Sequence, residues 1–148
     1  MRSLTLVSFA LSILSAAPVD SQTANATRMV DVGGHAMRAL TRNLDRRRPG
    51  SPVLVFEAGA TNSLEVWNGV LAALPDDLPV VAYDRAGLGR SEWDDTRPTP
   101  RHVSTRLHAL LEAVGAGPPY VVVGYSWGGS LARWFAGYYP AEIAGLVF

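Results

Sequence analysis

The sequence predicts a single α/β domain in which a mostly parallel sheet carries helices on both faces. Short runs rich in β-branched residues alternate with stretches whose apolar residues recur at helical spacing. The runs at residues 52–56 and 78–83 are apolar throughout, as expected for strands covered on both sides. With 148 residues, 48% of them hydrophobic, the chain is long enough for one core and too short for two ordinary domains.

The first residues differ in kind from the rest. Arg2 gives a positive start, and residues 4–17 form an apolar run without a charge. This pattern is typical of a secretory signal peptide, and the run is too short for a stable membrane span. We predict a signal peptide at residues 1–26, a domain at residues 27–148, a secreted or periplasmic location, and no stable membrane span in the mature chain. Retention as a short anchor is the alternative.

The predicted elements of the domain begin with a hairpin, because β-rich residues 29–32 and 36–41 flank the turn signal Gly33-Gly34. The apolar run at residues 52–56 predicts a buried strand. In chain order we then expect a helix from Ser63 to Leu74, a strand at 78–83, a helix from Thr99 to Val114, a strand at 120–123, a helix from Ser126 to about Tyr139, and a strand from Ile143.

The helix boundaries follow from capping and breaking residues. Ser63 and Thr99 are polar residues that can accept hydrogen bonds from the first free amides of a helix. Pro75 and Pro140 end the helices that precede them, and Gly115 closes the helix from Thr99 to Val114.

Composition argues against several function classes. The 13 basic and 13 acidic residues balance, whereas nucleic-acid-binding proteins concentrate basic residues. The only basic run, residues 46–48, is typical of a solvated loop. The sequence contains no cysteine, so disulfide bonds and thiol chemistry are excluded. We predict no cofactor, no metal and no nucleic-acid partner.

The strongest chemical signal is the G-x-S-x-G pattern at residues 124–128. A serine in a sharp strand-to-helix turn adopts unusual backbone angles, so Gly124 and Gly128 must be small for the turn to close. An ordinary turn can match this pattern by chance. Here a Val-rich strand precedes it and a helix follows, which favours Ser126 as a nucleophile.

Residues 57–60, Glu-Ala-Gly-Ala, follow the first buried strand and are candidates for an oxyanion hole. Acyl transfer creates a tetrahedral oxyanion that two backbone N–H groups can stabilise. We expect these groups at Trp127 and Ala60, with Gly59 letting the backbone pass close to substrate. A plain turn is the alternative, and Glu57 fits a structural role better than a catalytic one.

Residues 83–91, Tyr-Asp-Arg-Ala-Gly-Leu-Gly-Arg-Ser, follow the next buried strand. Their glycines allow a tight turn, and glycine-rich loops before helices bind phosphate in some proteins. The lysine-serine tail of a P-loop does not follow, and no helix begins at once. We therefore expect no nucleotide site here.

Together with the Gly-Gly-His hairpin, these motifs resemble the α/β-hydrolase superfamily, in its lipase- and esterase-like branch, over about residues 30–148. The resemblance implies the α/β-hydrolase fold, an active site at the carboxyl ends of the strands, and a triad of Ser, acid and His in that chain order. It makes Ser126 the nucleophile and assigns the oxyanion hole to the Ala60 and Trp127 amides. The supporting loop residues are Gly59, Asp84, Arg85, Gly124 and Gly128.

The sequence departs from the family pattern after Ser126, where the family places its acid and histidine. Residues 127–148 contain no Asp and no His, and Glu142 is their only carboxylate. We expect the three histidines, which are His35, His102 and His108, on the surface or on a helix face away from the strand ends. The domain is therefore predicted to be truncated after the strand that follows the nucleophile helix, or to be a degenerate copy, and to be nearly inert as it stands.

The predicted function is hydrolysis of an ester or related small-molecule acyl substrate. Serine at position 126 favours acyl chemistry, whereas aspartate there would indicate epoxide or haloalkane chemistry. A peptidase of the same fold is one alternative, and a non-catalytic binding protein is another.

Overall fold

The structure is a computed structural model that describes residues 25 to 148, with side chains from residue 27. Its strands are β1 (Asn25–Asp31), β2 (Ala36–Arg42), β3 (Val53–Glu57), β4 (Val80–Tyr83), β5 (Tyr120–Gly124) and β6 (Ile143–Val147). Its helices are α1 (Asn68–Ala73), α2 (Pro100–Ala113) and α3 (Trp127–Tyr138), with 3-10 turns η2 (Leu64–Trp67) and η3 (Pro140–Glu142). The predicted signal peptide lies almost wholly outside the described residues.

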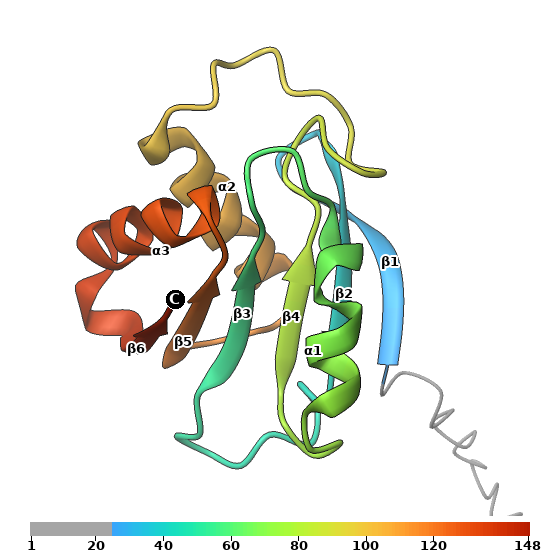
Figure 1. Ribbon diagram of the computed structural model, residues 1–148, viewed down its shortest axis with the longest axis vertical. Helices are drawn as coiled ribbons and strands as arrows, with labels where there is room; N and C mark the ends of the chain where they lie inside the picture. Colours follow the sequence, from blue (N-terminus) through green and yellow to red (C-terminus); the bar gives the residue numbers. More distant parts are fainter. Residues whose placement is uncertain (1–24) are drawn as a thin grey trace, which may run out of the picture.

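The six strands form one sheet in the order β1-β2-β4-β3-β5-β6. The hairpin of β1 and β2 is antiparallel, and β2 also runs antiparallel to β4. The strands β4, β3, β5 and β6 are mutually parallel, because each is joined to the next in sequence by a helical crossover. The mostly parallel sheet predicted from the sequence is confirmed, and the parallel strands all end at the upper edge in Figure 1.

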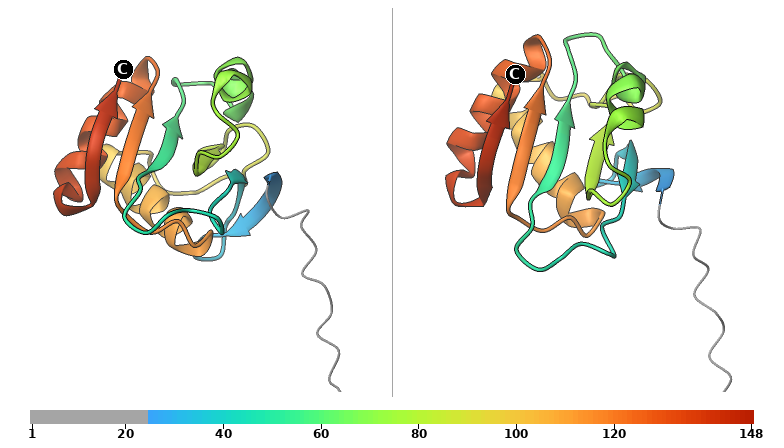
Figure 2. Two further views of the ribbon diagram at one scale, coloured as in Figure 1. Left: turned by 90° about the horizontal axis from the view of Figure 1, so that it is seen from below. Right: turned by 60° about the horizontal axis from the view of Figure 1, so that its bottom comes forward.

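Helices cover both faces of the sheet, as predicted: α1 lies on one face, and α2 and α3 lie on the other (Figures 1 and 2). Val55 of β3 packs in the larger core, with Leu110 of α2 and Phe135 of α3. The next residue, Phe56, points to the opposite face and packs in a second core with Trp67. Burial on both faces explains why the central strands read as unbroken apolar runs.

The predicted cap at Ser63 is wrong, although the cap at Thr99 is confirmed. Ser63 makes no side-chain capping hydrogen bond, and a short 3-10 turn precedes α1. The Leu64 amide donates instead to Asp84 Oδ1 at 2.7 Å, because the buried carboxylate at the end of β4 is a stronger acceptor than a serine hydroxyl. Thr99 accepts a hydrogen bond from the His102 amide at 3.2 Å, as a helix cap should.

In the described part of the chain, β6 lies at the edge of the sheet and pairs with β5. Two apolar residues at its end are largely exposed, Val147 and Phe148, and so is Trp134 on the outer side of α3. The Arg133 guanidinium lies 4.6 Å from the centre of the Phe148 ring. Within residues 25–148, no helix combines the length and apolar character needed to cross a membrane.

Candidate active site

Ser126 occupies the turn between β5 and α3 and has an unusual backbone conformation. Its φ is 55° and its ψ is −122°, a combination that side-chain-bearing residues rarely adopt. The Tyr125 amide donates to the Glu57 carbonyl at 3.1 Å, which ties the turn to the end of β3. Ser126 is exposed, so the turn presents its side chain at the surface above the sheet.

Close backbone packing requires glycine on both sides of the turn. A methyl group at Gly128 would lie 2.5 Å from the Ala58 carbonyl oxygen and closer still to that of Glu57. A methyl group at Gly124 would lie 2.5 Å from the α-carbon of Gly129. Real side chains do not occupy such positions, and the obstacles are backbone atoms, so only glycine lets the helix start this close to β3.

Arg85 binds the backbone of the loop that follows β3. Its guanidinium donates to the carbonyl oxygens of Ala58 at 2.6 Å and Ala60 at 3.0 Å, and also to that of Gly59. In a trans peptide the carbonyl and the following N–H point in opposite directions. Because the Gly59 carbonyl faces Arg85, the Ala60 amide faces away from it. Gly59 itself is buried, and Ala60 is exposed.

A buried charged network anchors this bracing arginine. Arg85 Nη1 lies 2.5 Å from Glu57 Oε1, and the Tyr83 hydroxyl donates to the other oxygen of Glu57. Burial raises the pKa of the Glu57 carboxyl, while the Arg85 guanidinium and the Tyr83 hydroxyl act in the opposite direction. Glu57 is thus buried and bonded to Arg85 and Tyr83, which fits a structural role.

Asp84 joins three segments around the site. It is fully buried, and its carboxylate accepts from the amides of Leu64 at 2.7 Å and Arg90 at 2.9 Å. The Arg38 guanidinium lies 3.4 Å away. The carboxylate therefore connects the start of η2 with the glycine-rich turn at residues 84–91. Both Asp84 and Arg85 thus make hydrogen bonds to loop backbone.

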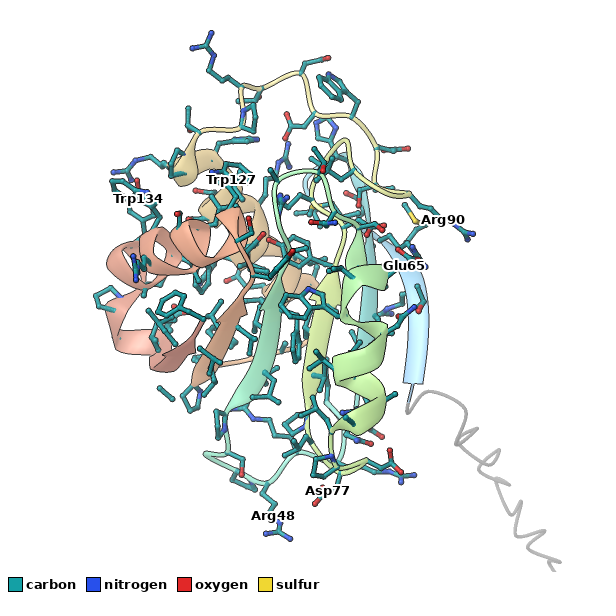
Figure 3. The ribbon with its side chains drawn as sticks, in the orientation of Figure 1. Arg48, Glu65, Asp77, Arg90, Trp127 and Trp134 are labelled. Atoms are coloured by element: carbon teal, nitrogen blue, oxygen red, sulfur yellow. The ribbon has the colours of Figure 1, made fainter. Side chains whose placement is uncertain are left out.

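A cavity of about 440 Å³ lies beside the turn at residues 124–128, which we call the elbow. Ala60 and Trp127 line it, while Ser126 is the chain neighbour of Trp127 and is not itself a lining residue. Figure 3 shows Trp127 at the amino end of α3, at the edge of the sheet where the parallel strands end. The two residues expected to form the oxyanion hole are therefore brought to one cavity.

The lining of the same cavity includes a polar cluster that sequence reasoning missed. Its members are Asp94, His102 and Arg106. His102 Nε2 lies 2.6 Å from Asp94 Oδ2, and Arg106 Nε donates to the same oxygen at 2.8 Å. The expectation that His102 lies away from the strand ends is wrong, because the first turn of α2 reaches the cavity. The Thr99-Pro100 start of that helix was the signal that could have placed it there.

Asp94 is held in its ionised form by its contacts. Burial alone would raise the pKa of its carboxyl, but hydrogen bonds from the Thr96 amide, His102 and Arg106 outweigh this and hold the pKa well below its usual range. His108, by contrast, lies outside this cavity, with Nε2 3.1 Å from Glu142 Oε1 and its ring stacked on Tyr139. Within residues 25–148, no group of three or more His, Cys, Asp or Glu side chains is placed to hold a metal ion.

A family defined by the alpha/beta hydrolase fold matches residues 52–148. This range contains the elbow, the loop at residues 58–60 and the glycine-rich turn at residues 84–91. The chain belongs to the α/β-hydrolase fold family. The match begins at β3 and includes all of the parallel strands, so it covers the part of the sheet that positions the site.

Individual relatives in this family are hydrolases. The lipase LipV of Mycobacterium tuberculosis is 37% identical over 106 residues, which cover 71% of this chain and 40% of the lipase. The human monoacylglycerol lipase ABHD6 is 31% identical over 106 residues, which cover 68% of this chain and 31% of that protein. The structure of the epoxide hydrolase CorEH without ligand matches with a TM-score of 0.67 and 29% identity, covering 82% of this chain and 40% of that one. The chain thus spans less than half the length of each.

Proposed function

We propose that the protein is a serine hydrolase that acts on an ester or a related acyl substrate. The strained conformation of Ser126, at the end of β5 and at the start of α3, is the observation that carries the proposal. Strain of this kind persists only where the surrounding structure imposes it, and here Gly124 and Gly128 make it possible. A serine at this position, in a family that includes lipases and epoxide hydrolases, favours acyl chemistry over epoxide chemistry.

In the proposed reaction, Ser126 Oγ attacks the substrate carbonyl carbon while its proton passes to a general base. The oxyanion accepts hydrogen bonds from the Ala60 and Trp127 amides, and its collapse expels the alcohol and leaves an acyl-serine that water hydrolyses. Arg85 supports this step indirectly, because its bonds to the carbonyls of residues 58–60 orient the loop that carries the Ala60 amide.

A non-catalytic binding protein on the same fold is the second candidate. One observation favours it: residues 127–148 contain neither Asp nor His, so the acid and base that the family places after the serine have no counterpart there. A binding protein of this kind should hydrolyse no acyl ester, so an assay on such esters distinguishes the two candidates.

Replacement of the nucleophile tests the proposed function. Ser126→Ala should lower kcat for p-nitrophenyl butyrate by about 10⁴-fold or more, because the remaining oxyanion donors and binding contacts give only a small residual rate. Ser130→Ala, at an exposed serine one turn further along α3, should change kcat less than about twofold. Hydrolysis that survives Ser126→Ala would contradict serine catalysis, and absence of hydrolysis in the parent protein on a panel of acyl esters would favour the binding protein.

We also propose that residues 1–26 direct export and are removed. The mature chain should begin between Ser21 and Thr27, because small residues follow the apolar run there. Strand β1 begins at Asn25, so cleavage directly before Thr27 would remove its first two residues. Amino-terminal sequencing of the exported protein measures the cleavage point, and an intact Met1 on a membrane-bound product would contradict it.

A further inference from the structure

The polar cluster in the cavity wall has no role in the serine chemistry described above. It combines a buried carboxylate, Asp94, with a partly exposed histidine, His102, in a cavity whose other walls are largely apolar, including Tyr83, Trp93 and Val103. Ala60 and Trp127 line the same cavity. A ligand whose carbonyl reaches the proposed oxyanion hole would therefore enter the cavity that His102 also lines.

The contacts of Asp94 determine the hydrogen-bonding character of His102. Asp94 is ionised and accepts at Oδ2, so a neutral His102 carries its proton on Nε2. This tautomer leaves Nδ1 as a hydrogen-bond acceptor. The charge of Asp94 is already balanced by Arg106, which in turn donates to the Val32 carbonyl at 2.5 Å and is thereby tied to the hairpin. With a neutral His102 the charges of Asp94 and Arg106 cancel, and Nδ1 is the acceptor that the cluster offers a ligand.

We propose that His102, held by Asp94 and Arg106, is a specificity residue that binds a hydroxyl group on the substrate at a distance from the scissile ester. The substrate class is an ester whose acyl or alcohol part is an aliphatic chain that carries a hydroxyl group. The apolar walls bind the chain, and His102 distinguishes it from an unsubstituted chain, because a site built around a polar partner discriminates against ligands that leave that partner unpaired. Asp94 is a positioning residue that fixes the tautomer.

This inference rests on the proposed function only in taking an ester as the ligand. Its test therefore measures binding and not turnover. The protein used for binding carries Ser126→Ala. Ethyl 6-hydroxyhexanoate and ethyl heptanoate form a matched pair, because they differ by the exchange of a terminal hydroxyl for a methyl group. Binding is followed by tryptophan fluorescence, since Trp93 and Trp127 line the cavity.

His102→Phe should weaken binding of the hydroxy ester by about tenfold and change binding of the heptanoate less than about threefold. His102→Gln keeps a hydrogen-bond acceptor, so it should retain most of the affinity for the hydroxy ester. His108→Phe is the matched control, because this second histidine of α2 lies outside the cavity, and it should leave both esters unaffected. Equal losses for both esters, or no loss for either, would overturn the proposal.

The role of Asp94 has a separate readout. In the parent protein, the ring ¹⁵N signals of His102 should show the proton on Nε2, and Asp94→Asn should shift the ring toward a mixture of tautomers while weakening the hydroxy ester selectively. An unchanged tautomer with unchanged binding would overturn the positioning role. If Ser126→Ala leaves hydrolysis intact, the proposed function fails, but the binding measurements still decide the assignment of His102.

Discussion

Gly128→Ala should destabilise the protein more than any other single methyl addition near the elbow, by about 3 kcal/mol or more. The added methyl group would lie within 2.5 Å of the Ala58 carbonyl oxygen and closer to that of Glu57. Both obstacles belong to the backbone at the end of β3, which is paired on both sides in the middle of the sheet and cannot move without breaking its ladder. Urea denaturation of both proteins measures the free energy of unfolding.

Gly137→Ala is the matched control for this prediction. Gly137 belongs to the same helix, α3, and a methyl group there meets no atom within 4 Å beyond its chain neighbours and the nearby backbone of its own helix. Because alanine has a higher helix propensity than glycine, this variant should be more stable than the parent by about 0.5–1 kcal/mol. Equal stability of the two variants would show that α3 does not start as close to β3 as the structure indicates.

Arg85→Met should destabilise the protein by about 3–5 kcal/mol, because it leaves the Glu57 carboxylate buried without its counter-charge. The same change removes the hydrogen bonds to three consecutive loop carbonyls. Arg101→Met removes an exposed arginine of α2 that stacks on Tyr138, and it should change the free energy of unfolding by less than about 0.5 kcal/mol. Denaturant unfolding compares the two variants.

The decrease in the free energy of unfolding caused by Arg85→Met should depend on pH. Burial raises the pKa of Glu57 in the folded protein, and removal of Arg85 takes away the main opposing charge, so the folded pKa lies further above the unfolded one. A carboxyl of this kind binds more protons when folded, so stability decreases as pH rises through the interval between the two values. The variant should therefore be less destabilised near about pH 5 than near about pH 8. In Glu57→Gln/Arg85→Met the carboxylate is gone, and this pH dependence should disappear. A destabilisation by Arg85→Met that does not change with pH would contradict the pairing of Arg85 with a buried Glu57 carboxylate.

Local pattern was sufficient to predict much of the sheet and the elbow. Continuous apolar runs predicted β3, β4 and β5, because strands covered on both faces have no polar side. The order strand, G-x-S-x-G, helix predicted the turn at Ser126, because the pattern specifies a conformation within five consecutive residues. The limits of α2 also followed from its own ends, at Thr99 and Gly115.

The contacts that complete the site could not be predicted from the sequence, because they join residues that are distant along it. The Leu64 amide is capped by Asp84, 20 positions away, and this contact replaced the local cap expected at Ser63. Arg85 reaches the backbone of residues 58–60 only because β3 and β4 are adjacent parallel strands that end at the same edge.

The sequence by itself determined where the strained turn at Ser126 lies, because this turn depends on which residues stand two positions on either side of it. Only the tertiary structure decided what faces that turn. The pairing of Asp94 with His102, and the cavity they share with Trp127, depend on how α2 packs against the sheet. Packing of this kind depends on the shape and burial of many side chains together, so no short segment of the sequence encodes it.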